Sequence, residues 1–564
     1  MRRAAVVSLF LCLGALCAAP ALARQGSRFR PGVSGTRGVI ATESPAAARV
    51  GRAVLERGGN AIDAAAATVF AMGVARPQSC GIGGGGFMVY RSHHGRARAL
   101  DFREIAPAAM NPTSLSGPGL HKTFTGHLTV GIPGVVAGMD AALARYGTLT
   151  LRQVIAPAES LARNGVRVTN AVSSAMSGNA SRLGLFPVAA AQYLRPDGTA
   201  YPPHSLLRQP ELAASLRRIM RGGPAAFYRG TIARRIVRDM QAPRPATQDP
   251  GLLTLADFAA YHAKWRNPLF GSYRGAGIVA MPPPTSGGIA LLEILNVLEG
   301  FDLRSAGQSS TQAIHLITEA EKIALADRAR YVADPDFVSV PTGTLTSKAY
   351  AATRRSEIDP THAGTYNAGA ITPPGASTTH ISVIDARGNA VALTCTIEQE
   401  FGSAVVAPGT GFLLNNELTD FGAPGTANEP RPGKRPRSSM SPTIVVRDHK
   451  PVLVVGAAGG ATIIMGPLLA VVDTIDFGLD IPHALDAERF DAISGQLAME
   501  DARVDPAVLA QLESMGYTLQ RQGEYATRPR MQAAGIDLSS GLRVAASDPR
   551  SEPGALAQRR RGTG

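Results

Sequence analysis

A polar segment at residues 354–377 divides the chain into two parts with different secondary-structure signals. It reads "RRSEIDPTHAGTYNAGAITPPGAS" and has no hydrophobic periodicity, which is typical of an exposed linker. Helical spacing dominates the part before it. The part after it is β-rich, with runs such as "HISVID", "AVALTCTI", "TIVVRD" and "PVLVVGAAGG". This mixture predicts an α+β fold in which stacked sheets lie between outer helices, an αββα layering.

Several elements before the linker have clear signals. Ser44 suits a helix N-cap, Pro45 suits the first helical position, and Gly58-Gly59 would end that helix. An Ala-rich helix is expected at 60–77, and a glycine loop leads into a strand at 80–90. Further strands are expected at 96–104, 127–134 and 275–281. Further helices are expected within 150–265 and at 289–300 and 310–333.

The first 23 residues have the pattern of a secretory signal. Arg2 and Arg3 precede an apolar run, and Ala21-Leu22-Ala23 is an A-x-A cleavage site. An uncleaved anchor is the alternative, but the run is short for a transmembrane helix. We therefore expect an exported, periplasmic or secreted, bacterial protein without a membrane anchor. The formal charge is +14, but the positive residues are scattered except at 431–437 and the tail, so we predict no nucleic-acid partner.

Two cysteines, Cys80 and Cys395, remain once the signal is removed. They form neither a disulfide framework nor a metal-binding spacing, so two buried free thiols are expected, with a single bridge as the alternative. The histidines show no ligand spacing, and the chain has no G-x-S-x-G, H-E-x-x-H or P-loop motif. No metal or cofactor is expected.

A hairpin begins directly after the linker, where "TTHISVID" and "AVALTCTI" flank the turn "ARGN". If Asp385 opposes Ala390, Thr379 lies opposite Thr396 and Thr378 lies opposite Ile397; a slip of one residue is the alternative. In either register, the start of the first strand lies beside Thr396 and Glu398. This group of hydroxyls and a carboxylate is either a polar strand edge or a reactive site.

A threonine becomes nucleophilic without a histidine if it is the first residue of a chain, because its free α-amine, with a pKa near ~8, then acts as the base. That chemistry requires a cut between Ser377 and Thr378, and the linker directly upstream suits one. His380 is expected to be an ordinary strand side chain.

Many motifs of this chain resemble, in the same order, those of γ-glutamyltransferases. After the linker they are "TTHISVID", "GNAVALTCTI", "FGSAVVAPGTGFLLNNELTDF", "GKRPRSSMSPTIVV" and "GAAGG". Before it they are "GIGGGGFMVY", "LDFREIAPAAM", "GIPGVVAGMDAALARYGTL", "MPPPTSGGIALLEILNVLEGFDL" and "DRARYVADPDFV". The resemblance runs from about residue 35 to residue 550. It implies an N-terminal-nucleophile hydrolase fold, formed jointly by a large subunit (24–377) and a small catalytic subunit (378–564) after self-cleavage before Thr378.

The resemblance also implies roles for individual residues. Thr378 would attack the γ-carbonyl of glutathione or another γ-glutamyl compound, and Thr396 would hydrogen-bond the nucleophile. The backbone amides of Gly459 and Gly460 would stabilise the oxyanion. The acyl group would then pass to water or to an amino acid or dipeptide. The substrate-binding residues would be Arg103, Ser438 and Ser439 for the α-carboxylate, and Glu417 and Asp420 for the α-ammonium.

Two departures from the family pattern bear on the pocket. Glu398 stands where well-known members carry Asn, which adds a carboxylate near the ammonium site. The loop between Asp420 and Ser438 is short, so we expect a more open pocket, with the basic run at 431–437 on its rim. The alternatives are a related glutaryl-type β-lactam acylase and an unprocessed, inactive homologue with a binding role.

Overall fold

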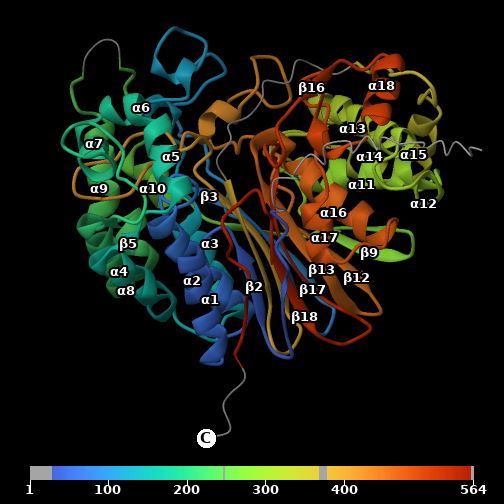
Figure 1. Cartoon of the computed structure of the whole chain (residues 1–564). Helices are drawn as coiled ribbons and strands as arrows, with labels where there is room; N and C mark the ends of the chain where they lie inside the picture. The colour runs from blue at the N-terminus through green and yellow to red at the C-terminus, as the bar shows by residue number, and fades with distance from the viewer. Residues whose placement is uncertain (1–27, 245–247, 368–377, 560–564) are drawn as a thin grey trace, which may run out of the picture.

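Two stacked seven-stranded sheets form the centre of the protein, and helices cover both outer faces (Figure 1). The computed structural model describes residues 28–244, 248–367 and 378–559. The expected signal at 1–23 and the proposed cleavage residue Ser377 lie outside these ranges. The predicted αββα layering is confirmed.

The first sheet has the strand order β19-β2-β10-β11-β3-β4-β7, and all of its pairs are antiparallel. In that order the strands are Leu556–Ala557, Val39–Thr42, Thr378–Ile384, Ala390–Thr396, Gly85–Arg91, Ala97–Asp101 and Lys264–Arg266. The second sheet has the order β1-β18-β17-β13-β12-β9-β8. Its strands are Val33–Gly35, Arg543–Ser547, Arg530–Ile536, Lys450–Ala458, Thr443–Arg447, Ala276–Ala280 and Leu269–Tyr273. Both sheets therefore contain strands from before and after the linker.

The helices separate into two layers (Figure 1). The layer on the first sheet contains α1 to α10: Pro45–Glu56, Ala61–Ala75, Val135–Tyr146, Leu151–Asn164, Asn170–Gly178, Ala180–Gly184, Pro187–Tyr193, Pro210–Tyr228, Thr231–Met240 and Leu255–Ala260. The layer on the second sheet contains α11 to α18: Gly287–Leu298, Leu303–Ala306, Thr311–Tyr331, Thr342–Leu345, Lys348–Arg355, Met465–Ile475, Ile481–Asp486 and Pro506–Ser514. Among the described residues, no helix combines the length and the apolar character needed to cross a membrane.

Short elements complete the fold. Two small sheets contain β5 (Val166–Arg167) with β6 (Leu206–Leu207), and β14 (Phe490–Asp491) with β15 (Leu497–Met499) and β16 (Leu519–Arg521). The described residues also contain the 3-10 turns η1 to η5, which cover Leu120–Thr123, His127–Thr129, Glu417–Asp420, Gly460–Ile464 and Asp501–Arg503.

The N-cap and the first residue predicted for the first helix are confirmed. The Ser44 hydroxyl accepts a hydrogen bond from the backbone amide of Ala47, and α1 begins at Pro45. Asn60 caps α2 in a reciprocal capping box with Asp63. Both helices pack against the first sheet, so the Ala-rich sequence of α2 allows close contact with the strands β10 and β11.

The strand predicted at 127–134 is wrong. His127–Thr129 is a 3-10 turn, and the following residues pair through an isolated bridge between Ile105 and Ile132. The backbone amides have other partners: Gly131 donates to Asn415 Oδ1 at 2.9 Å and Gly134 donates to the Gly84 carbonyl at 2.8 Å. Since tertiary contacts satisfy these amides, the segment does not need a strand ladder.

Side chains of β10 alternate between two environments, as strand geometry requires. Ile381 and Val383 pack toward the first helical layer. On the opposite face the Ser382 hydroxyl donates to the Val454 carbonyl of β13 at 2.9 Å. Thr378 and His380 share that face with Ser382, so the space between the sheets contains polar groups at the start of β10.

The expected linker at 354–377 begins inside α15, which ends at Arg355. Residues 356–367 form neither helix nor strand. Residues 368–377 lie outside the described part of the chain.

Candidate active site

The first residue of β10 and the last residue of β11 form the centre of the site. Thr378 lies directly opposite Thr396, and their Oγ1 atoms are 3.2 Å apart, within hydrogen-bonding distance. Thr378 and Thr396 are 4% and 2% exposed, so this contact is shielded from water. The two hydroxyls that were predicted to lie near each other do so.

The register differs by one residue from the primary prediction and matches the alternative. Ile384 pairs with Ala390, so the loop contains the five residues Asp385–Asn389. The primary prediction gave this loop four residues. The Asp385 carboxylate accepts hydrogen bonds from the amides of Arg387 and Asn389. Because Asp385 folds into the turn instead of extending the strand, every pair moves by one position, and Thr378 rather than Thr379 faces Thr396.

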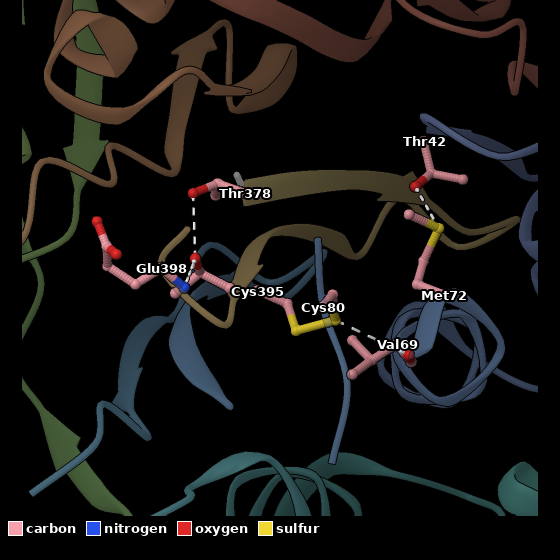
Figure 2. Close-up of a disulfide and its surroundings, with 8 residues drawn as sticks. Thr42, Val69, Met72, Cys80, Thr378, Cys395 and Glu398 are labelled. Carbon is pink, nitrogen blue, oxygen red and sulfur yellow. Dashed lines mark hydrogen bonds between the residues drawn. A yellow bond between two sulfur atoms is a disulfide. The ribbon is translucent and has the colours of Figure 1, made fainter. Parts of the chain in front are cut away.

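Thr396 is also bonded to the turn that follows its strand. The backbone amide of Glu398 donates to Thr396 Oγ1 at 2.9 Å, and Glu398 adopts a φ of +75°, which is uncommon for a residue with a side chain. Figure 2 shows Glu398 extending away from Thr378 beyond this turn. Thr396 therefore holds both the nucleophile candidate and the turn that carries Glu398.

Cys80 and Cys395 form a disulfide, and the expectation of two free thiols is wrong. Their Cα atoms are 5.5 Å apart although 315 positions separate them in the sequence. Cys395 is the neighbour of Thr396 on β11, and its side chain points to the opposite face, toward α2 (Figure 2). If the chain is cut before Thr378, this bond joins the two products directly behind Thr378 and Thr396.

The glycine pair predicted to form the oxyanion site lies at the end of β13. Gly460 lines the same pocket as Thr378 and begins η4, which continues into α16. The first amides of a helix have no partner within it, so they are available to an anionic oxygen. Gly459 has a φ of +155°, and a Cβ there would lie 3.1 Å from Pro529 Cα, so this turn requires glycine.

Two acidic side chains bind one arginine in the pocket. Glu417 and Asp420 begin and end the 3-10 turn η3, and residues three apart in such a turn lie on the same side. Arg103 binds Glu417 through Nη1 and Asp420 through Nη2, the latter at 2.6 Å. Burial raises the pKa of Asp420, and the Arg103 guanidinium opposes that shift. The three groups place both signs of charge next to Thr378.

Ser438 and Ser439 form a further part of the pocket lining, the serine wall. Ser438 Oγ accepts from the Met440 amide at 3.1 Å, and Ser286 donates to the Ser438 carbonyl at 2.6 Å. Ser439 Oγ accepts from Arg328 Nη2 at 2.9 Å. Arg328 comes from α13 and was not among the predicted site residues. Its only sequence signal was its place in "DRARYVADPDFV", where nothing distinguished it from its neighbours.

One small pocket unites these groups. Every residue assigned to the chemistry or to the substrate lines it except Gly459, which adjoins Gly460. The lining residues are Arg103, Thr378, Thr396, Glu398, Glu417, Asp420, Ser438, Ser439 and Gly460, together with Met440 and Ile463. Residues from both sides of the linker, far apart in the sequence, thus converge on the Thr378 hydroxyl.

His380 lies in the strand interior, as expected. Its ring nitrogens lie 2.9 Å from Thr394 Oγ1 and 3.1 Å from Ser382 Oγ. Burial lowers the pKa of His380 to about 3, so the ring is neutral at physiological pH.

The expected basic rim is wrong. Lys434 and Arg435 are buried and Arg437 is half-buried. Lys434 binds the carbonyls of Ala427 and Glu429, and Arg435 forms an ion pair with Asp101. Arg437 binds backbone carbonyls at the end of α13. Only the Arg431 side chain is substantially exposed, at 50%, and it pairs with Glu429. Partners within the protein therefore compensate for the positive charges of residues 431–437. A pocket more open than in relatives stays a prediction.

Among the described residues, no cluster of His, Cys, Asp or Glu has a metal-binding arrangement.

Comparisons with known proteins identify relatives along nearly the whole chain. The sequence model of a family described as Gamma-glutamyltranspeptidase matches residues 47–558. A "Glutathione hydrolase proenzyme" of Escherichia coli (strain K12) is 40% identical over an alignment of 580 positions, which covers 98% of each chain.

Acylases are also among the relatives. An "Acylase ACY 1 proenzyme" of Pseudomonas sp. (strain SE83) is 39% identical over 499 residues, 86% of this chain and 88% of that one. A crystal structure of cephalosporin acylase from Bacillus halodurans superimposes with a TM-score of 0.85 at 28% identity, covering 96% of this chain and 100% of that one.

Proposed function

Because the chain belongs to the gamma-glutamyltranspeptidase family, we propose that it is a self-processing enzyme whose nucleophile is Thr378. The chain is a γ-glutamyltransferase with glutathione hydrolase activity. The observation that carries the assignment of the nucleophile is the pocket in which the Thr378 and Thr396 hydroxyls lie 3.2 Å apart, beside Gly460 and the charged side chains.

Processing begins with attack of Thr378 Oγ1 on the carbonyl carbon of Ser377. The C–N bond to Thr378 breaks, the hydroxyl proton is transferred to the departing nitrogen, and an ester joins the two parts. Water hydrolyses this ester, which leaves a carboxylate on Ser377 and a free amine and hydroxyl on Thr378. The products are the large subunit 24–377 and the small subunit 378–564. They remain together as a heterodimer, because both sheets contain strands from each.

In turnover the free α-amine of Thr378, with a pKa near ~8, accepts the hydroxyl proton as Oγ1 attacks the γ-carbonyl of the substrate. The amides of Gly459 and Gly460 stabilise the tetrahedral oxyanion. The leaving amine departs with the proton and a γ-glutamyl ester remains on Thr378. Water, an amino acid or a dipeptide then accepts the acyl group. Thr396 orients the nucleophile throughout.

The glutamyl head is a zwitterion, and the pocket supplies a partner for each charge. The α-carboxylate binds the Arg103 guanidinium and the hydroxyls of Ser438 and Ser439. The α-ammonium binds Glu417 and Asp420, with Glu398 as a third carboxylate. Without substrate, Arg103 is the shared ion-pair partner of the two acids of η3. Insertion of the zwitterion adds a positive charge beside the acids and a negative charge beside Arg103, which lowers the cost of burying these groups.

A glutaryl-type acylase is the second candidate, since one relative of similar identity has an acylase name. Such a substrate has no α-ammonium, and the acids Glu417 and Asp420 would then face a carboxylate or an apolar group. Their position in the pocket favours a γ-glutamyl donor.

A chromogenic γ-glutamyl amide and the matching glutaryl amide, each assayed with and without glycylglycine, test the function. We expect release from the γ-glutamyl amide that glycylglycine accelerates. Release from the glutaryl amide alone supports the acylase, and a single uncut chain without release supports an inactive homologue.

Localisation is a separate proposal. Residues 1–23 act as a signal that directs export to the periplasm or the medium and is then removed. Mass spectrometry of the protein recovered from a periplasmic extract tests this, because a chain that retains residue 1 in the cytoplasm contradicts it.

A further inference from the structure

A buried arginine without a carboxylate partner lies behind the serine wall of the pocket. Arg328 is in the last turn of α13 and is 4% exposed. Its Nη2 donates to Ser439 Oγ at 2.9 Å and its Nε donates to Ser286 Oγ at 2.7 Å. Within the described part of the chain it forms no ion pair with an acidic side chain. Burial and the nearby Arg437 lower the pKa of Arg328, while Asp420 opposes the shift.

Burying an arginine in this setting is energetically unfavourable. Removing a charge from water is strongly unfavourable unless an opposite charge and hydrogen bonds compensate for it. Arg328 is bonded to hydroxyls, which offer dipoles but no negative charge. A guanidinium so placed against the wall of a ligand pocket indicates that the ligand supplies the compensating anion.

The hydrogen-bond directions show how Arg328 could act on that anion. Arginine can only donate, so Ser439 Oγ is the acceptor and its own hydrogen remains available for another partner. Ser439 lines the pocket, so that hydrogen can reach a ligand. Ser286 accepts from Arg328 in the same way and donates to the Ser438 carbonyl at 2.6 Å. One guanidinium thus fixes both the Ser439 hydroxyl and the backbone that carries Ser438.

We propose that Arg328 is a positioning residue for the α-carboxylate of the γ-glutamyl group. It holds Ser439 as a hydrogen-bond donor and adds a second positive charge, after Arg103, to the carboxylate subsite. This inference rests on the proposed function. A chain of charge-assisted hydrogen bonds from Arg328 through Ser439 to the carboxylate binds more strongly than an isolated hydroxyl would.

Competitive inhibition tests this role. L-Glutamate carries the α-carboxylate, whereas 4-aminobutyrate is the same molecule without it. Inhibition constants for both are measured against a chromogenic γ-glutamyl amide in wild type, Arg328→Gln and Arg328→Lys. In Arg328→Gln we expect KM and the glutamate constant to rise about 10- to 100-fold, the range for one lost charge-assisted bond. The 4-aminobutyrate constant and kcat should change little.

Further variants test the same role of Arg328. Arg328→Lys keeps the charge but cannot donate in a planar fork to both serines, so its effect should be intermediate. Ser439→Ala combined with Arg328→Gln should be less than additive, because both act on the same bond. Arg330→Gln, on the exposed side of the same helix, is the matched control and should leave all constants unchanged.

Equal changes in the two inhibition constants would overturn the proposal, because a structural defect does not distinguish ligands by their carboxylate. An unchanged glutamate constant in Arg328→Gln would also overturn it. If that variant fails to fold or process, Arg328→Lys and Ser439→Ala must each still weaken glutamate selectively. Failure of the proposed function itself is recognised separately, since wild type would then release nothing from the γ-glutamyl amide.

Discussion

Replacing Thr396 with valine should slow catalysis while leaving the fold intact. Valine has nearly the same shape as threonine but lacks the hydroxyl. The change removes the 3.2 Å contact with Thr378 Oγ1 and leaves the Glu398 amide, which now donates at 2.9 Å, without its acceptor. Since Thr396 is 2% exposed, water cannot easily replace either bond.

The size of the effect follows from these contacts. Leaving one partner of a buried hydrogen bond unsatisfied costs about 1–3 kcal/mol. Each 1.36 kcal/mol in an activation free energy changes a rate about tenfold, so kcat should fall about 10- to 100-fold if the loss appears in the transition state. Self-cleavage uses the same nucleophile and should slow by a similar factor.

Turnover of a chromogenic γ-glutamyl amide, normalised to the amount of processed small subunit, measures the effect. Thr396→Ser should recover most of the rate, because it restores the hydroxyl. Thr379→Val is the matched control: Thr379 is buried next to Thr378 on β10, and its hydroxyl has no hydrogen-bond partner among the described residues. A Thr396→Val enzyme that is fully processed and turns over at the wild-type rate would refute the role given to Thr396.

Three further changes test other parts of the structure. The processed enzyme should run as one band on a non-reducing denaturing gel and as two after reduction, whereas Cys80→Ser should give two bands in both, because the bond to Cys395 joins the subunits; two bands for non-reduced wild type would contradict this. With the pKa of His380 lowered to about 3, protonation favours the unfolded chain as pH falls from 6.5 toward 3. Wild type should therefore lose about 2 kcal/mol of unfolding free energy relative to His380→Gln between pH 7 and pH 5, measured by urea denaturation. Glu104 has the opposite sign, because burial raises its pKa to about 8. Glu104→Gln should gain on the order of 2 kcal/mol over wild type as pH rises from 5 to 7, and a difference independent of pH would refute the assignment.

Local signals in the sequence predicted the elements that carry the site. The caps of α1 and α2 depend on residues within a few positions of each helix start, so Ser44 and Pro45 were sufficient for the prediction of α1. The segment 127–134 has strand-like composition, but Asn415 and Gly84 satisfy its amides from distant parts of the chain. No local sequence pattern indicates such distant hydrogen-bond partners.

The parts of the site that depend on a local motif were predictable from the sequence. The parts that depend on contacts between distant elements were not. Thr378 and Thr396 follow from the hairpin, although the turn chemistry of Asp385 moved the register by one. Pairing of Cys80 with Cys395 depends on the packing of α2 against β11. Nothing in the sequence distinguishes Arg328 from its neighbours, because its role arises only where α13 reaches the serine wall.

The mass and N-terminal sequence of the small subunit test the central claim most directly. The account predicts a purified wild-type protein whose smaller chain begins at Thr378 and ends at the chain terminus. It also predicts that Thr378→Ala remains one long, inactive chain, because the residue that cuts the precursor is the residue that later attacks the substrate. A Thr378→Ala protein that is still cleaved at this bond, or a wild-type small chain that begins at another residue, would contradict it.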